Sequence, residues 1–320
     1  MSPQPRVLPA DPSPVTDAES VLLAGHDVPL GRYTTVRRLL PQRPRRMVGA
    51  WCFVDAFGPE DVSGRPGMQV APHPHCGLQT VTWLVEGQIV HRDSVGHDQA
   101  IRPGQLNLMT SGRGISHSEM SPADHPPTMH GLQLWIALPD SARGTAPRFE
   151  HHAELPQVAL QGGRATVVVG AYAGVHSPAQ VHSPLLALEL GTDASAPLRL
   201  ELDPAFEHGV LVLTGAATVD GLALEPGSLL YVPPGSRLLE VTSGQPARLF
   251  VIGGEPFEEP LVMWWNFVAR THEEVVQARE EWEHGDRFGV VRCDAERLPA
   301  PALPSVRLKA RDRHGASLPA

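Results

Sequence analysis

Short apolar or alternating segments recur along most of the chain, and Gly, Pro and Asp separate them. Alternation of apolar and polar side chains is typical of half-buried strands, and clusters of Gly and Pro mark turns. In the first half these segments are residues 50–58, 80–87, 88–94, 106–112 and 130–139. They resume in the second half at residues 165–174, 185–190, 209–215, 217–221, 228–235 and 247–254. The pattern predicts the strands of a sandwich or barrel in each half.

One segment near the C-terminus follows a helical period instead. Thr271 and Glu274 match a capping box, in which two side chains satisfy the free N–H groups at a helix start. Four apolar residues follow at roughly helical spacing, namely Val275, Val276, Ala278 and Trp282. Gly285 is placed to end the helix. We therefore expect one short helix between Thr271 and Gly285.

The two halves share an internal repeat. Residues 84–112 run from an apolar strand through Gly to a Pro-Gly turn and a second strand that ends in Gly. Residues 212–235 repeat this order with a shorter hairpin in the middle. Two copies of one strand-rich segment predict duplicated β-barrel domains.

The domain boundaries follow from these segments and from the length of 320 residues, which suits two domains. Residues 1–20 are rich in Pro and Ser, and we expect a poorly ordered tail there. We expect a first domain at 21–140, a polar linker or crossover at 141–165, and a second domain at 166–292. Residues 293–320 are expected to be a C-terminal tail.

Composition narrows the class of protein. Gly 30 and Pro 33 together are about a fifth of the chain, which favours many turns. The net charge of −9 repels polyanions and argues against direct contact with nucleic acid. The three cysteines form no CxxC pair, which fits a reducing compartment. No signal-peptide core and no apolar run of membrane-spanning length is present, so we expect a cytoplasmic protein that does not enter a membrane.

Two pairs of side chains that can bind metal stand out. His73 and His75 lie in the stretch PHPHCG, and His117 and Glu119 lie in GISHSE. Residues two apart in a strand share a face, so each pair points one way, whereas Cys76 points the other way. Three imidazoles and a carboxylate without a thiolate suit Fe(II), Mn, Co, Ni or Cu better than structural zinc.

The spacing alone leaves an ordinary alternative open. The chain has 16 histidines, so two such pairs can arise by chance on a surface. Gly77, Gly112, Gly114 and the Pro103-Gly104 turn favour a metal site, because they suit the tight turns of a small barrel.

Longer segments resemble a known family. Residues 72–87, 91–96, 101–122 and 130–139 together resemble the pirin family of the cupin superfamily. Segments 45–59 and 258–268 match pirin patterns too, so the resemblance covers about residues 28–292. It implies an all-β bicupin, with two antiparallel β-barrel (jelly-roll) domains and a short C-terminal helix.

The resemblance also implies a metal centre in the N-terminal barrel. The three His and one Glu that hold the family's metal match His73, His75, His117 and Glu119. The implied cofactor is one mononuclear divalent metal ion per chain, first of all Fe(II), with Mn, Co, Ni, Cu or Zn as alternatives. Many pirins carry Glu where this chain has Gln79, which changes the polarity expected of the pocket wall.

The second barrel of the family is metal-free. Aligning the repeats places Glu201, Asp203 and Glu240 opposite the ligand positions of the first copy. Three carboxylates can hold a hard cation, but solvated charges at strand ends are the favoured interpretation.

Several further residues are candidates for the substrate pocket or for support of the metal. The pocket candidates are Gln79, Met109, His130, Gln133 and Trp135, with core packing as the alternative for the last four. His91 and Asp93 share a strand face and either orient a ligand imidazole or tie a hairpin.

The resemblance implies a function. Quercetin 2,3-dioxygenase activity occurs in the pirin family, so the expected substrates are a flavonol-like aromatic molecule and O₂, and carbon monoxide is released. Glu119 is the expected general base. The alternative is a metal- or redox-sensing regulatory protein that binds a protein partner without turnover. Its only support is a dense basic run, for which a solvated face is the commoner interpretation: Arg37, Arg38, Arg43, Arg45 and Arg46.

Overall fold

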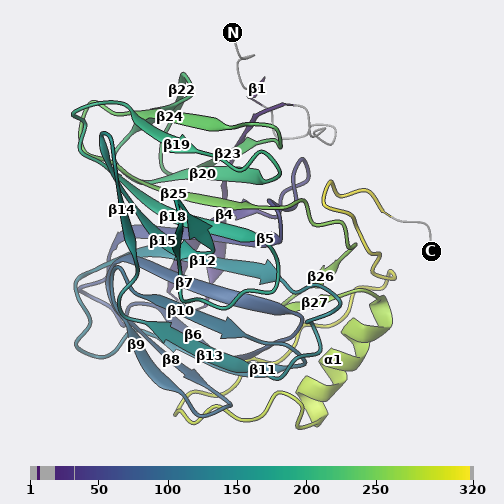
Figure 1. Cartoon of the computed structure of the whole chain (residues 1–320). Coiled ribbons are helices and arrows are strands. Elements are labelled where there is room, and N and C mark those ends of the chain that lie inside the picture. Colours follow the sequence, from purple (N-terminus) through teal and green to yellow (C-terminus); the bar gives the residue numbers. More distant parts are fainter. Residues whose placement is uncertain (1–5, 8–18, 32, 318–320) are drawn as a thin grey trace. The chain divides into compact units, whose positions relative to one another are not determined.

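The computed structural model describes residues 6–7, 19–31 and 33–317. Within them the secondary structure consists of strands and one helix, α1 (His272–His284), so the all-β expectation with a short C-terminal helix is confirmed (Figure 1). Most of the tail expected at residues 1–20 lies outside the described residues. In the described part of the chain, α1 has 13 residues, and no helix there has the length and apolar character needed to cross a bilayer.

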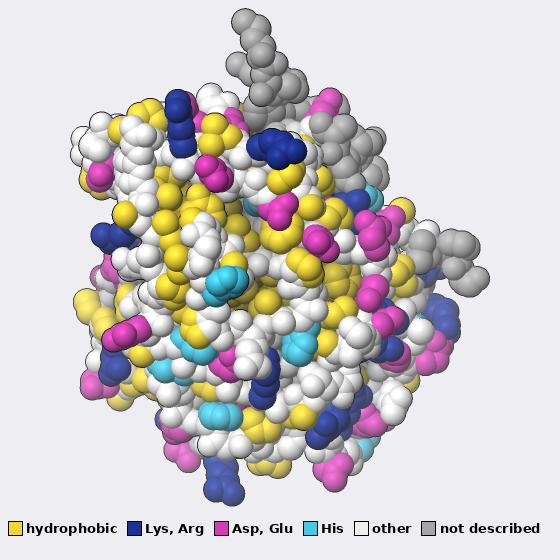
Figure 2. Space-filling model, viewed as in Figure 1, with side chains coloured by type: hydrophobic (Ala, Val, Ile, Leu, Met, Phe, Trp, Pro, Cys, Tyr) yellow, Lys and Arg dark blue, Asp and Glu magenta, His cyan; other side chains and the backbone are white. Residues whose placement is uncertain are grey.

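Charge is spread over the surface in view. Figure 2 shows Lys and Arg side chains interspersed with Asp and Glu, without a continuous basic patch on that face. This distribution agrees with the acidic net charge of −9. Neither feature offers the basic face that binding to a polyanion requires.

The chain divides into two compact units. Unit 1 comprises residues Met1–His26, Arg37–Val54 and Glu154–Phe257, and unit 2 comprises Asp27–Val36, Asp55–Ala153 and Glu258–Ala320. Three strands contain points where the chain passes between the units, namely β3 (His26–Leu30), β4 (Thr34–Leu40) and β5 (Trp51–Asp61). The expected domain boundaries stay a prediction. Residues 141–165, expected as a linker, contain β13 (Arg148–His152), β14 (Gln157–Leu160) and the start of β15 (Gly163–Val169).

Unit 1 is built around an eight-stranded sheet and a four-stranded sheet. Their strand orders are β1-β2-β23-β20-β25-β18-β15-β14 and β19-β24-β21-β22, and β16 pairs with β17. The strand bounds are β1 Arg6–Val7, β2 Val21–Ala24, β14 Gln157–Leu160, β15 Gly163–Val169, β16 Ala171–Tyr172, β17 Val175–His176, β18 Leu185–Thr192, β19 Leu198–Glu201, β20 Glu207–Thr214, β21 Ala217–Val219, β22 Leu222–Leu224, β23 Ser228–Val232, β24 Leu238–Thr242 and β25 Arg248–Gly254.

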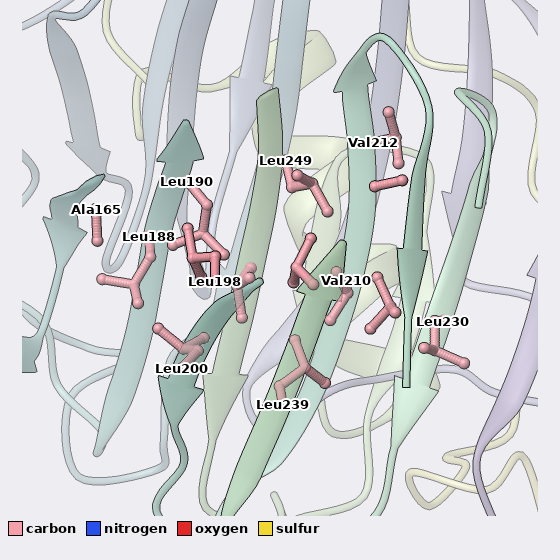
Figure 3. Close-up of a cluster of buried hydrophobic side chains, with 14 of the residues drawn as sticks. Ala165, Leu188, Leu190, Leu198, Leu200, Val210, Val212, Leu230, Leu239 and Leu249 are labelled. Atoms are coloured by element: carbon pink, nitrogen blue, oxygen red, sulfur yellow. The ribbon is translucent and has the colours of Figure 1, made fainter. Parts of the chain in front are cut away.

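The core of unit 1 lies between these two sheets. Leu188, Val210 and Leu249 of the large sheet belong to the same buried cluster as Leu200 and Leu239 of the small one (Figure 3). Strand β19 alternates buried Leu with exposed charged residues, which is the pattern of a strand with one face on the core. Burial of this apolar surface is the main favourable contribution to folding of the unit.

The arginine run lies in unit 1 and is solvated only in part, because Arg37 and Arg43 are exposed whereas Arg45 is not. Arg45 is buried, lies 3.3 Å from the Glu207 carboxylate and stacks over Tyr231. Arg38 lies over the ring of Phe53. A buried charge needs such a partner, and the sequence did not reveal Glu207 because it lies 162 positions away.

Unit 2 contains the segments with the candidate ligands. One sheet runs β13-β10-β7-β12 and continues with β5, β4 and β3, and a four-stranded sheet runs β6-β11-β8-β9. The strand bounds are β6 Gln69–His75, β7 Leu78–Glu86, β8 Ile89–Asp93, β9 Asp98–Ile101, β10 Leu106–Thr110, β11 Ile115–Met120, β12 Thr128–Ala137, β13 Arg148–His152, β26 Val262–Trp264 and β27 Phe267–Ala269.

Helix α1 packs beside the β26–β27 hairpin in the same unit (Figure 1). The Thr271 hydroxyl accepts a hydrogen bond from the Glu274 N–H, as the capping box predicts. The Glu274 carboxylate accepts a hydrogen bond from the backbone N–H of Arg270. Gly285 closes the helix by donating its N–H to the Glu281 carbonyl. Val275, Ala278 and Trp282 form the buried face.

Candidate metal centre

Antiparallel pairing of β6 and β11 brings the two ligand pairs together. The register places His117 directly opposite His73, and Ile115 opposite His75. Directly opposed residues share a face of the sheet, so the three imidazoles project to the same side. A register shift between His117 and Glu119 then displaces Glu119, which lies opposite Val70 on one side and His91 on the other.

The three histidines form one compact group. Their rings are 4.4 to 4.9 Å apart between centroids, and their ligand nitrogens lie within 4.8 Å of one another. Such a group can hold one metal ion. All three side chains are buried.

Hydrogen bonds fix which ring nitrogen is free. The Nδ1 of His73 lies 2.9 Å from the Ala71 carbonyl, and the Nδ1 of His75 lies 3.2 Å from the Asn266 carbonyl. Carbonyl oxygens only accept, so each Nδ1 carries the proton and each Nε2 keeps its lone pair. The Nε2 of His117 is buried and has no hydrogen-bond partner among the described residues. These nitrogens suit a metal ion, which needs neutral imidazole lone pairs.

Burial keeps the three imidazoles neutral. The pKa of His73 is lowered to about 4, chiefly by desolvation; the hydrogen bond to Ala71 opposes this shift and the nearby His91 adds to it. Desolvation, followed by the charge of neighbouring histidines, lowers the pKa of His75 and of His117 well below the usual value. At neutral pH the group therefore offers three unprotonated donors.

Glu119 stands in a second, overlapping group. Its ligand oxygen lies within 4.8 Å of ligand nitrogens of His91 and His117, so His117 belongs to both groups. Its Oε1 accepts a hydrogen bond of 2.8 Å from the Thr82 hydroxyl. Burial raises the pKa of Glu119, although His91 and the Thr82 hydrogen bond oppose the rise. A carboxylate with a raised pKa is a better base than an exposed one.

The sheet that contains β10, β7 and β12 presents two rows of side chains toward this cluster. One row crosses Met109, Thr80 and Trp135, and the Trp135 ring meets the His75 ring edge-on at 5.1 Å. The second row includes Thr82 and Gln133, whose Oε1 lies 3.1 Å from the Thr82 hydroxyl. Met109, Gln133 and Trp135 therefore share the sheet face that looks onto the metal candidates.

Two pocket candidates lie elsewhere. Gln79 is opposite Thr110 and Ile136, so it occupies the other face of the sheet, where its amide donates to the Thr110 hydroxyl. The alternation of side chains along β6 does not continue to Gln79, because Gly77, at φ +74°, follows the strand and redirects the chain into another sheet. His130 lies far along β12, opposite Glu86 and beyond a register shift.

Three contacts were missed from the sequence. They are the Asn266 carbonyl on His75, the Thr82 hydroxyl on Glu119, and the Phe149 ring stacked on His91 at 4.2 Å. Asn266 lies in the tight turn of the β26–β27 hairpin, next to Trp265 with φ +51°. A backbone carbonyl carries no side-chain signal in a sequence, although the family-like segment 258–268 marked the region.

The corresponding carboxylates of the second repeat lie on the surface of unit 1. Glu201 and Asp203 are exposed, and Glu240 forms an ion pair of 3.0 Å with Arg199. The repeat therefore places ordinary surface charges where the first copy has buried imidazoles.

Comparison with known proteins places the chain in a family. The pirin model matches residues 33–136, and the model of the pirin C-terminal cupin domain matches residues 187–289. A relative in Pseudomonas aeruginosa, named as a candidate quercetin 2,3-dioxygenase, is 46% identical over 86% of this chain and 88% of its own. The chain belongs to the pirin family.

Other relatives agree with this pirin assignment. A pirin-like protein of Caulobacter vibrioides is 36% identical over 78% of this chain and 88% of its own. A crystal structure of quercetin 2,3-dioxygenase from Acinetobacter baumannii superposes with a TM-score of 0.87 at 43% identity. That match covers 90% of this chain and 97% of the other. The bicupin architecture implied by the sequence is thereby confirmed.

Proposed function

We propose that this pirin is a metal-dependent dioxygenase of the quercetin 2,3-dioxygenase type. The observation that carries the proposal is the cluster of three buried, neutral imidazoles with free nitrogens beside the buried carboxylate of Glu119. Relatives at 46% and 43% identity that bear this enzyme name support it.

The donor set fits a metal ion. Each of His73, His75 and His117 offers an uncharged nitrogen, and the unpartnered Nε2 of His117 would otherwise be a costly buried group. We propose that these three and Glu119 hold one mononuclear divalent ion. Fe(II) is the first choice, with Mn, Co, Ni, Cu or Zn as alternatives, because imidazole and carboxylate ligands accept all of them. When bound, the ion supplies Lewis-acid chemistry that makes a hydroxyl of the substrate more acidic.

The protein's own residues would then bind the substrate and move one proton. Trp135 and Met109 offer apolar surface to a flat aromatic ring, and Gln133 offers an amide. The Glu119 carboxylate takes the proton of the flavonol 3-hydroxyl as general base, and the Thr82 hydroxyl holds Glu119 in place. O₂ then adds both its oxygen atoms to the flavonol, one ring carbon leaves as carbon monoxide, and a depside remains.

The test is turnover of quercetin. Iron-loaded protein in air is expected to bleach quercetin and release carbon monoxide in equal amounts. Glu119→Gln keeps the volume of the side chain but removes the base, so the rate should fall by roughly 10²-fold or more. His117→Ala should lose both bound iron and turnover. Absence of turnover at one metal ion per chain would contradict the proposal.

The regulatory alternative has no comparable support. The basic run that suggested it includes the buried ion pair of Arg45 with Glu207, which is internal to unit 1. We place the enzyme in the cytoplasm, since three cysteines without a CxxC pair form no disulfide framework, as a reducing compartment allows.

A further inference from the structure

A chain of hydrogen bonds leads away from the metal candidates on the side of His117. The Nδ1 of His117 lies 3.3 Å from the Nδ1 of His91, and the Nε2 of His91 lies 3.1 Å from Oδ2 of Asp93. His91 and Asp93 are buried, and Phe149 stacks on the His91 ring with 12° between the ring planes. Both nitrogens of His91 are thus engaged, which leaves it no lone pair for a metal ion.

The direction of the protons in this chain follows from Asp93. Its Oδ1 accepts the backbone N–H groups of Val95 and His97, each at 3.0 Å, so the carboxylate is fixed in orientation. An ionised carboxylate only accepts, so the Nε2 of His91 must carry a proton. An imidazole that carries its proton on Nε2 has its lone pair on Nδ1. Since a contact of 3.3 Å between two ring nitrogens needs one proton between them, the Nδ1 of His117 must supply it.

We propose that Asp93 and His91 are positioning residues that select the Nδ1–H tautomer of His117 and so leave its Nε2 lone pair free for the metal. Ala71 and Asn266 do the same for His73 and His75 through backbone carbonyls. His117 differs because its tautomer is set through side chains and can be inverted by substitution. Partners of this kind tune the affinity of a metal site. The inference rests on the proposed metal site but needs no turnover to be tested.

The direct test is the tautomer of His117 in metal-free protein. Full-length protein labelled with ¹⁵N in histidine is stripped with a chelator, and its imidazole nitrogens are recorded by NMR at neutral pH. Spectra of His117→Gln and His91→Gln assign the two rings. We expect His117 as the Nδ1–H form and His91 as the Nε2–H form. A wild-type His117 in the Nε2–H form would overturn the proposal, whether or not the protein cleaves a flavonol.

Asp93→Asn should reverse the donor and acceptor roles along these hydrogen bonds without changing the shape of the side chain. The two backbone N–H groups at Oδ1 hold the amide oxygen there, so the amide NH₂ faces the Nε2 of His91. His91 must then accept at Nε2 and donate from Nδ1, which forces His117 into the Nε2–H form. We expect this switch in the spectrum and a metal affinity weaker by roughly 10–100-fold. An unchanged tautomer in Asp93→Asn would contradict the assignment.

Matched variants separate positioning from damage to the fold. Asp98→Asn makes the same change on the same hairpin, at an exposed residue paired with Arg92, and should leave affinity and tautomer unchanged. His91→Asn places an amide oxygen where Nδ1 stood and can still accept from His117. It should therefore retain more metal affinity than His91→Leu, which offers no acceptor. Equal losses of metal affinity in these two variants would contradict a positioning role and leave His91 only a packing role.

Discussion

At the residue scale, each cluster histidine has Nδ1 hydrogen-bonded and Nε2 left for a ligand. The partners differ, since His73 and His75 use backbone carbonyls and His117 uses His91. Burial then removes the competing proton by lowering the pKa of the imidazoles. Local hydrogen bonds and burial together make ordinary histidines into metal donors at neutral pH.

The Thr82 hydroxyl offers a residue-scale prediction for the proposed base. Its hydrogen bond stabilises the ionised form of Glu119 and lowers the pKa of that carboxyl against the effect of burial. Thr82→Val should raise the pKa further, so the acid limb of the pH–rate profile should move to higher pH. Thr80→Val, on the same face one row away, is the matched control. A profile that does not move would argue against Glu119 as the base.

The sequence predicted the grouping of the candidate ligands better than their surroundings. Within each pair, His73 with His75 and His117 with Glu119, the two residues lie on one strand, where residues two apart share a face. Gln79 lies on the other side of the turn at Gly77, so alternation along β6 does not predict its face. Phe149 was not found because only the pairing of β13 with β10 brings it to His91.

At the element scale, the junction of β6 and β7 holds one end of the site. Gly77 follows the strand of His75 with φ +74°, and a Cβ there would lie 2.0 Å from the Val268 carbonyl oxygen. The two backbone segments are also hydrogen-bonded to each other, since the Val268 N–H donates to the Cys76 carbonyl. Close approach of two backbones explains why only glycine fits.

Gly77→Ala should therefore destabilise the protein and weaken metal binding. Gly104→Ala is the matched control, because Gly104 has φ +79° but open space around its Cβ position. The control should cost about 1–2 kcal/mol of unfolding free energy from the left-handed backbone alone. Gly77→Ala should cost clearly more in urea denaturation, and its metal affinity should fall while that of Gly104→Ala does not. Equal costs would contradict the close-approach argument.

The strands, the repeat and the helix were accessible from the sequence because periodicity and capping are local signals. The interleaved composition of the two units was not, since residues 37–54 and 258–320 each join a unit built mainly from distant segments. Long-range strand pairing determines that assignment, and alternation along a strand does not name its neighbour.

At the scale of the whole molecule, one repeat carries the metal candidates and the other has an apolar interior. In unit 1, His208 on β20 is buried, and neither of its ring nitrogens has a hydrogen-bond partner among the residues described. Desolvation lowers the pKa of His208 to about 4, against the opposing charge of Asp203. Unit 1 thus contains a titratable group that the proposed chemistry does not use.

This histidine should make stability depend on pH. The folded state resists protonation until about pH 4, whereas an unfolded histidine takes up a proton near pH 6.5, so stability falls as the pH drops through that window. In metal-free protein, the loss between pH 7 and pH 5 should be about 2 kcal/mol smaller in His208→Leu than in wild type. His176→Leu, at an exposed position, is the control. Identical pH dependence in wild type and His208→Leu would contradict the assigned burial effect.

The central claim is that three imidazoles and one carboxylate of the first repeat hold a single metal ion. Its most direct test is a crystal of metal-loaded protein measured at the absorption edge of the added metal. We predict one anomalous peak per chain, bonded to Nε2 of His73, His75 and His117 and to a carboxylate oxygen of Glu119. A peak held by other residues, or no peak at full metal load, would contradict the account.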